Sequence, residues 1–188
     1  MADTIAAIAT GAQVAAIGII RISGPEALPI VDRLFRPASG KLMSEYEDRK
    51  LVYGRLTDLS GDLLELCLCT VSHAPHSSTG EDTAELQCHG SPTVLRAALE
   101  ELFHAGARQA LPGEFTKRAF LSGRMELSSA EAVADIIDAE SIECAKNAAA
   151  QLSGAVAVKA DNIYSTLTDI SSHYHAVLDY PDEDIAVS

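Results

Sequence analysis

The sequence lacks the features that would place the chain in a membrane or outside the cell. No stretch approaches the roughly 18 unbroken apolar residues that a membrane span needs. No basic segment precedes the first apolar run, so we expect no signal peptide. The four cysteines, Cys67, Cys69, Cys88 and Cys144, form no CxxC pair. We therefore expect reduced thiols and a cytoplasmic protein.

Basic residues are scarce. The chain has 14 Lys and Arg against 27 Asp and Glu, which gives a formal net charge of −13. A segment that grips a nucleic-acid backbone by itself usually has a basic face. The composition therefore weighs against nucleic-acid binding by this segment alone and favours an acidic, soluble surface, with no membrane partner.

The common catalytic motifs are also missing. The sequence contains no GxxxxGK[ST] phosphate loop, no GxGxxG before a helix, no HExxH and no nucleophile elbow. We predict no catalytic residue and no metal site in this chain. One alternative remains open, in which Cys67 and Cys69, two apart on one strand face, join Cys88 and His89 in a zinc-like ligand set. In the other interpretation, these cysteines are buried and pack as small apolar side chains.

Strand and helix signals alternate over the first two thirds of the chain. Apolar and β-branched runs predict strands at 4–10, 16–22, 51–58, 63–72 and 82–87, with a short return at 108–111. One helix is predicted from Pro25, with Phe35 in its apolar stripe. Further helices are predicted after Gly90-Ser91-Pro92 and after Pro112-Gly113. We predict an α+β domain over residues 1–123, with a mixed sheet and helices.

The residue pattern changes after Gly123 from mixed strand and helix signals to helix signals alone. From 128 to 178 there is no proline and one glycine, and Ser128 and Glu131 have the spacing of a capping box. Ile163, Leu167, Ile170 and Tyr174 form an apolar seam at helical spacing. We predict an all-α segment of long helices over 124–188. Because two long helices need a partner for this seam, we expect a truncated part of a larger protein.

Three features could bind a ligand. Arg21 lies at a strand end before a helix, which suits an anion site or a solvated surface. Glu85 alternates with apolar Ala84 and Leu86, so it is either exposed or directed into a pocket. The segment 112–124, which ends at Arg124, is dense in bases and would otherwise form a solvated face.

Taken together, these blocks resemble one family. GIIRISG, HSSTGEDTAELQCHG, PGEFTKRAFLSGRMELSSAEAVADIIDA and the closing LDYPDEDI are similar, in order, to the front part of the bacterial tRNA-modification GTPases of the MnmE (TrmE) family. The resemblance covers nearly the whole chain. It implies a folate-binding domain that forms homodimers and resembles that of the glycine-cleavage aminomethyltransferases. A helical domain, interrupted by a Ras-like G domain that is absent here, would follow.

The resemblance also implies an activity for the intact protein. With the flavoprotein MnmG, family members modify carbon five of the tRNA wobble uridine, using a folate one-carbon unit. They hydrolyse GTP at the G domain with potassium and magnesium. For this chain the implied cofactor is 5-formyl-tetrahydrofolate or a related reduced folate, and the implied contacts are Arg21, Glu85 and Arg124.

The sequence departs from the family pattern at three places. The loop 11–16 reads GAQVAA where a glycine-rich loop is usual, Arg124 stands where lysine is common, and Ser91 stands where glycine is common. Two alternatives follow: a dimerisation scaffold of the same protein that no longer binds folate, and a free-standing folate-dependent aminomethyltransferase. The short chain and the helical region from Ser128 fit the second alternative poorly.

Overall fold

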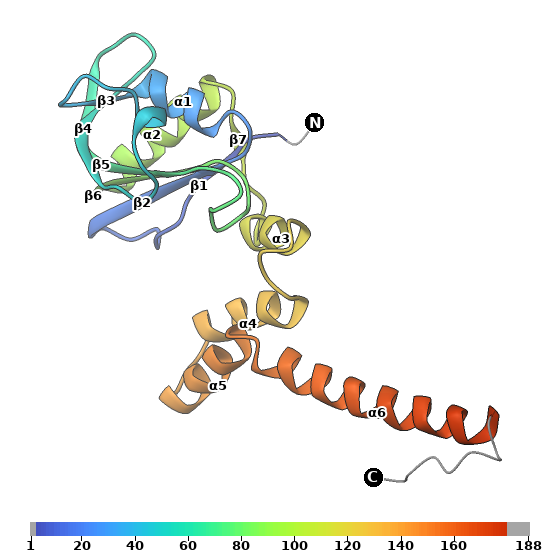
Figure 1. Ribbon diagram of the computed structural model, residues 1–188. Helices are drawn as coiled ribbons and strands as arrows, with labels where there is room; N and C mark the ends of the chain where they lie inside the picture. Colours follow the sequence, from blue (N-terminus) through green and yellow to red (C-terminus); the bar gives the residue numbers. More distant parts are fainter. Residues whose placement is uncertain (1–2, 180–188) are drawn as a thin grey trace. The chain divides into compact units, whose positions relative to one another are not determined.

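A computed structural model of the chain describes residues 3–179. The chain divides into two compact units, Met1–Arg124 and Met125–Ser188 (Figure 1). The first has a mixed sheet with helices and the second has helices, which confirms the predicted α+β fold followed by an all-α segment. Within the described range, no helix combines the length and the apolarity that crossing a membrane requires.

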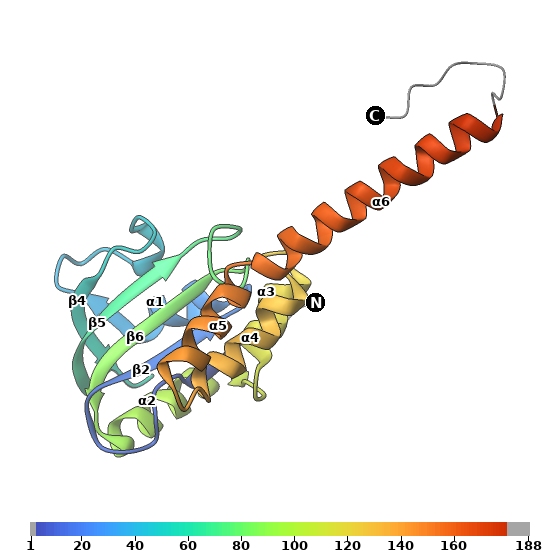
Figure 2. The same cartoon turned by 90° about the horizontal axis from the view of Figure 1, so that it is seen from below.

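One sheet of seven strands forms the first unit, in the order β3-β4-β5-β6-β2-β1-β7. All neighbouring strands are antiparallel except β1 and β7. Figure 2 shows β4, β5, β6 and β2 side by side. The strands are β1 (Ile5–Ile8), β2 (Ala15–Ser23), β3 (Phe35–Pro37), β4 (Val52–Thr57), β5 (Leu63–Ser72), β6 (Thr83–Gly90) and β7 (Arg108–Gln109).

The helices α1 (Ala27–Leu34) and α2 (Pro92–His104) pack against one face of this sheet. Strand residues alternate between two faces. Those that meet the helices are buried and apolar, among them Ile20, Ile22, Cys67, Leu86 and Cys88. The alternate positions face the other side, which neither helix covers. We call this second side the open face.

The segment around α1 differs from the prediction. The helix begins at Ala27 and not at Pro25, so Pro29 is its third residue. Pro29 fits there because the first N–H groups of a helix have no intrahelical acceptor. Phe35, predicted as helical, is extended and begins β3, while its ring stays fully buried. A short 3-10 helix, η1 (Met43–Glu45), follows.

The first unit ends with α3 (Glu114–Leu121). Arg118 of this helix donates to Glu81 with Nη1–Oε2 at 3.0 Å and to Glu114 with Nη2–Oε1 at 3.2 Å. It also pairs with Asp3 at 2.8 Å. Arg108 pairs with the same Glu114 and Asp3. This network ties α3 to the start of the chain and to the loop before β6.

The second unit is helical as predicted, with one long helix and two shorter ones. It contains α4 (Leu127–Ile137) and α5 (Ile142–Leu152), each of 11 residues, and α6 (Ala155–Asp179) of 25 residues. Two local features divide this helical stretch into separate helices. The Ser141 hydroxyl accepts from the Cys144 N–H at 3.1 Å and caps α5. Gly154, with φ +85, ends it.

The predicted capping box is wrong. The helix α4 starts at Leu127 with Glu126 as N-cap and without a side-chain cap, so Ser128 lies inside the first turn. Helix α4 packs against α5. The predicted apolar seam is present on α6, where Ile163, Leu167, Ile170 and Tyr174 are exposed. The closing LDYPDEDI motif extends beyond the described residues.

Candidate functional site

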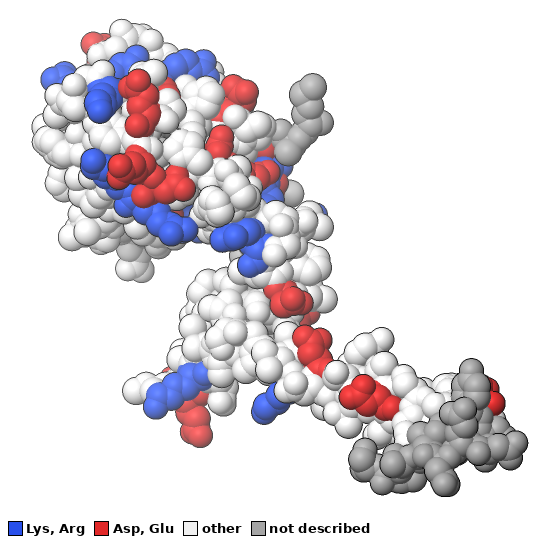
Figure 3. Space-filling model, viewed as in Figure 1, with Lys and Arg blue, Asp and Glu red and all other residues white. Residues whose placement is uncertain are grey.

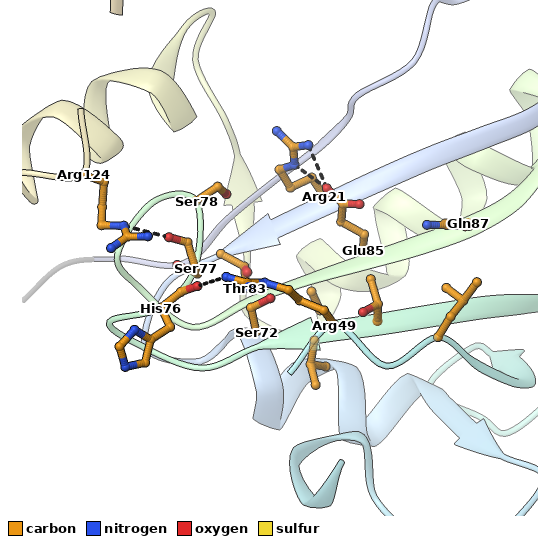
Figure 4. Close-up of a pocket in the computed structure, with 14 residues that line it drawn as sticks. Arg21, Arg49, Ser72, His76, Ser77, Ser78, Thr83, Glu85, Gln87 and Arg124 are labelled. Carbon is orange, nitrogen blue, oxygen red and sulfur yellow. Dashed lines mark hydrogen bonds and ion pairs between the residues drawn. The ribbon is translucent and has the colours of Figure 1, made fainter. Parts of the chain in front are cut away.

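A cavity of about 560 Å³ opens on the open face of the sheet. This volume is within the usual range for a small-molecule site. Strands β2, β5 and β6 form its floor, and the loop between β5 and β6 forms one wall (Figure 4). The polar side chains that line it are Arg21, Arg49, Thr70, Ser72, His76, Ser77, Ser78, Thr83, Glu85, Gln87 and Arg124.

The cavity brings together all three residues that the sequence singled out. Arg21 and Glu85 are direct cross-strand partners on β2 and β6. Arg124 follows α3 at the end of the first unit. The three residues come from distant parts of the chain, and they line one cavity because β2 and β6 are neighbours and α3 is anchored beside the β5–β6 loop.

Glu85 is held through one carboxylate oxygen. Arg21 Nε and Nη2 both contact Oε1, at 2.8 and 2.7 Å. Among residues 3–179, no donor contacts Oε2. The Arg21 guanidinium also lies 5.7 Å from the centroid of the Phe115 ring of α3, within cation–π range. The second oxygen of Glu85 is therefore a charged acceptor that a ligand could use.

Two hydroxyl groups of the cavity residues lack partners. Thr70 Oγ1 and Ser77 Oγ are buried, and neither has a hydrogen-bond partner within the described chain. Ser77 is only 3% exposed. Buried polar atoms are almost always satisfied, so an orphaned hydroxyl calls for a partner from outside the protein chain. Both hydroxyls belong to residues that line the cavity and could meet polar atoms of a bound molecule.

The wall of the cavity is a braced loop. The Thr79 hydroxyl is 2.7 Å from Ser23 Oγ, which donates to Glu81 Oε2 at 2.7 Å. From the side of α3, Ser122 Oγ donates to the Thr79 carbonyl at 2.7 Å. Because Arg118 also holds Glu81, the loop is fixed to both β2 and α3.

Two further guanidiniums reach the same wall. Arg124 Nε donates to the Ser77 carbonyl at 3.1 Å, and Arg49 Nη2 donates to the His76 carbonyl at 2.9 Å. Arg49 was not predicted from the sequence. It lies in the polar stretch Glu47-Asp48-Arg49-Lys50, which is indistinguishable from an ordinary surface loop. The bond from its backbone N–H to the Val71 carbonyl, at 2.8 Å, places it beside β5 at the cavity.

The cysteines do not assemble with His89. Cys67, Cys69 and Cys88 are buried on the helix-covered side, and burial raises the pKa of the Cys69 thiol. His89 is exposed at the alternate position and contacts Glu65 at 3.1 Å. Over the described range, no group of three or more His, Cys, Asp or Glu is placed to hold a metal ion.

The charge distribution gives no large basic surface on the face that Figure 3 draws. Acidic and basic side chains are interspersed over the first unit on that face. This mixture is consistent with the formal net charge of −13.

The fold and the site define a class of protein: a small α+β domain with a polar cavity, followed by a helical domain. Residues 4–124 match the family profile described as GTP-binding protein TrmE N-terminus, and residues 127–188 match the MnmE helical domain. The chain therefore belongs to the MnmE family.

Curated relatives agree with this assignment. The chain is 44% identical to a tRNA modification GTPase MnmE of Symbiobacterium thermophilum, over 98% of this chain and 40% of that protein. It is 44% identical to that of Bacteroides thetaiotaomicron and 42% identical to that of Clostridioides difficile, each over 97% of this chain. The chain spans about 40% of the length of these relatives.

Proposed function

We propose that the first unit binds a reduced folate in the cavity of the open face, with Glu85 as the anchor for the pterin ring. The observation that carries this proposal is the unpaired Oε2 of Glu85 beside buried, unpartnered hydroxyls. The amino-pyrimidinone edge of a pterin presents adjacent N–H donors. A carboxylate accepts such donors strongly because the acceptor is charged.

Calorimetric titration with 5-formyl-tetrahydrofolate tests this proposal. Glu85→Gln replaces a charged acceptor with an amide whose NH₂ faces donors. A hydrogen bond to a charged group contributes roughly 1.5–3 kcal/mol, so affinity should fall by about 10- to 100-fold. Glu47→Gln is the matched control, because Glu47 is exposed and does not line the cavity. Equal affinities for the wild type and Glu85→Gln would place the ligand elsewhere.

The alternative of a folate-free scaffold makes the opposite prediction. A wild-type chain that does not bind 5-formyl-tetrahydrofolate would favour it, in keeping with the altered loop 11–16. The cavity itself favours the folate proposal, because a scaffold has no need of buried hydroxyls that lack a partner among residues 3–179.

We propose also that two copies of the chain form a homodimer through the apolar part of the open face. Ile17, Tyr53 and Leu66 are exposed there and line a second depression, which shares Gln87 with the folate cavity. Three large apolar side chains around one depression are typical of an interaction surface. A symmetric pair is the commonest oligomer of a soluble protein.

Light scattering of the whole chain tests the dimer. The expected mass is near twice 19.9 kDa. Ile17→Glu should shift the protein toward monomer, since it would bury a charge at the interface. Leu111→Glu is the control, because Leu111 is as exposed but does not line this depression. A wild-type chain that stays monomeric at high micromolar concentration would contradict the proposal.

For the intact protein we propose the role that the family implies. It would act with MnmG in carbon-5 modification of the tRNA wobble uridine and hydrolyse GTP at a G domain with potassium and magnesium. The support is the printed name of the relatives, tRNA modification GTPase MnmE, and the match over nearly all of this chain. The contribution of this chain would be the folate site and the dimer contact.

A further inference from the structure

Two arginines of the cavity have no acidic partner among the described residues 3–179. Arg21, Arg108 and Arg118 all form ion pairs with carboxylates. For Arg49 and Arg124, no carboxylate of residues 3–179 lies within ion-pair distance. Within the described part of the chain, each guanidinium makes a single hydrogen bond. A guanidinium has five N–H donors, so most donors of both groups remain available.

The two guanidiniums converge on one stretch of wall. Arg49 holds the carbonyl of His76, and Arg124 holds that of the next residue, Ser77. Figure 4 shows them approaching this segment from opposite sides. The buried, unpartnered Ser77 hydroxyl belongs to the same segment. The wall therefore offers two positive charges and an orphaned hydroxyl at one place.

The backbone of Arg49 supports a binding role. Arg49 has φ +63, and among residues 3–179 no other residue except glycine has a positive φ. This conformation is unfavourable for a residue with a side chain, and such strain is concentrated at ligand sites. The neighbouring Asp48 carboxylate is engaged by His73: it accepts from the His73 backbone N–H at 2.9 Å and contacts its ring at 2.5 Å. These contacts with His73 lower the pKa of Asp48, and the charge of Arg49 also lowers it.

The cavity thus offers a hydrogen-bond acceptor at one place and cationic donors at another. Glu85 offers a charged acceptor from β6, while Arg49 and Arg124 offer donors at the wall. A reduced folate has the complementary arrangement, with N–H donors on its pterin edge and two carboxylates on its glutamate tail. We propose that Arg49, together with Arg124, binds the carboxylates of that tail, and that Arg49 gives the site its preference for a ligand with an anionic tail. This inference rests on the proposed folate function.

The test compares two ligands on the whole chain: 5-formyl-tetrahydrofolate and 5-formyl-tetrahydropterin, which lacks the aminobenzoyl-glutamate tail. The variant is Arg49→Gln, which removes the charge and keeps donors. Arg55→Gln is the matched control, since Arg55 is exposed and does not line the cavity. Melting temperatures of all three proteins verify folding.

Arg49→Gln should lower the affinity for 5-formyl-tetrahydrofolate by about 10-fold and leave the affinity for 5-formyl-tetrahydropterin unchanged. Added salt should weaken binding of the tailed ligand more in the wild type than in Arg49→Gln, because salt screens the charge of Arg49, which the variant lacks. Arg55→Gln should behave as wild type. Equal weakening of both ligands would show that Arg49 only shapes the wall, and unchanged affinity for the tailed ligand would also overturn the inference.

A third probe separates this inference from the folate proposal. N-(4-aminobenzoyl)-L-glutamate carries the tail without a pterin. Saturable binding that Arg49→Gln weakens, in a chain that binds no pterin, would retain the cation pair and reject the folate function. Folate binding that Glu85→Gln weakens and Arg49→Gln does not would retain the function and reject the inference. A tail probe that fails to bind the wild type would also count against the cation pair.

Discussion

Gly80 occupies a conformation and a space that exclude other residues. Its φ is +78, and a Cβ there would lie 2.7 Å from Ser122 Oγ and 2.8 Å from Ser122 Cβ. Ser122 in turn holds the Thr79 carbonyl. The missing side chain therefore lets the loop approach α3 closely enough for the cavity wall to be braced.

Gly80→Ala should destabilise the chain by roughly 1–3 kcal/mol, because it adds a steric clash to the left-handed strain. Gly61→Ala is the control: Gly61 has φ +93, and a Cβ there would meet nothing within 4 Å. Urea midpoints should fall further for Gly80→Ala, and its folate affinity should fall as well. Equal losses for the two variants would show that the contact with Ser122 does not constrain the loop.

At the scale of elements, α3 depends on its ion-pair network. Arg118 is only 12% exposed and contacts Glu81, Glu114 and Asp3, whereas Arg108 is 42% exposed. The Glu114 carboxylate accepts hydrogen bonds from Arg108, Arg118 and the Leu111 N–H. The hydrogen bonds from Arg108 are the largest cause that lowers the pKa of Glu114 from 4.5 to about 2.

The lowered pKa of Glu114 predicts acid sensitivity. A carboxyl group whose pKa is depressed by folding contributes stability above its ordinary pKa and loses that contribution as the pH falls toward its folded value. The stability of the wild type should therefore fall between about pH 5 and pH 2, and Asp3, whose pKa Arg108 also lowers, adds to this fall.

Glu114→Gln should be less stable at neutral pH and should lose less stability on acidification. Urea midpoints between pH 7 and pH 2 provide the measurement. The control is Glu100→Gln on α2, which removes an exposed carboxylate with no ion pair among residues 3–179. If Glu114→Gln and the control show the same pH slope as wild type, the network does not set acid stability.

Elements with strong periodicity were predictable from sequence. The strand predicted at 63–72 is β5, and the helix predicted after Gly90-Ser91-Pro92 is α2. Weaker signals failed where a local contact decided the outcome. Phe35 is extended because it pairs with Leu56 of β4, and Ser141 divides a helical stretch that has no proline.

The candidate site was predictable only in part, because strand order is not chain order. Arg21 and Glu85 stood out by their motifs, but their pairing requires β2 beside β6, which no local pattern reveals. Arg49 gave no signal, since its place in the cavity depends on a backbone bond to Val71. Polar residues in loops acquire meaning only when the tertiary structure positions them.

At the scale of the whole molecule, the absence of a phosphate loop from these 188 residues predicts no GTP hydrolysis by this chain alone. Purified chain with GTP, magnesium and potassium should release phosphate at the background rate. An inactive preparation with heat-unfolded chain sets that background. Turnover that follows the protein through successive purification steps would contradict the prediction.

The cavity residues span the first unit from Arg21 on β2 to Arg124 at its end. No short segment of the chain contains such a site, so a partly unfolded chain cannot form it. Its ligand would therefore recognise completion of folding, and at 100 times its dissociation constant it would add about 2.7 kcal/mol to the stability of the native state. During synthesis, the ligand could favour only chains whose first unit is complete, so cofactor supply and the yield of folded protein would rise and fall together.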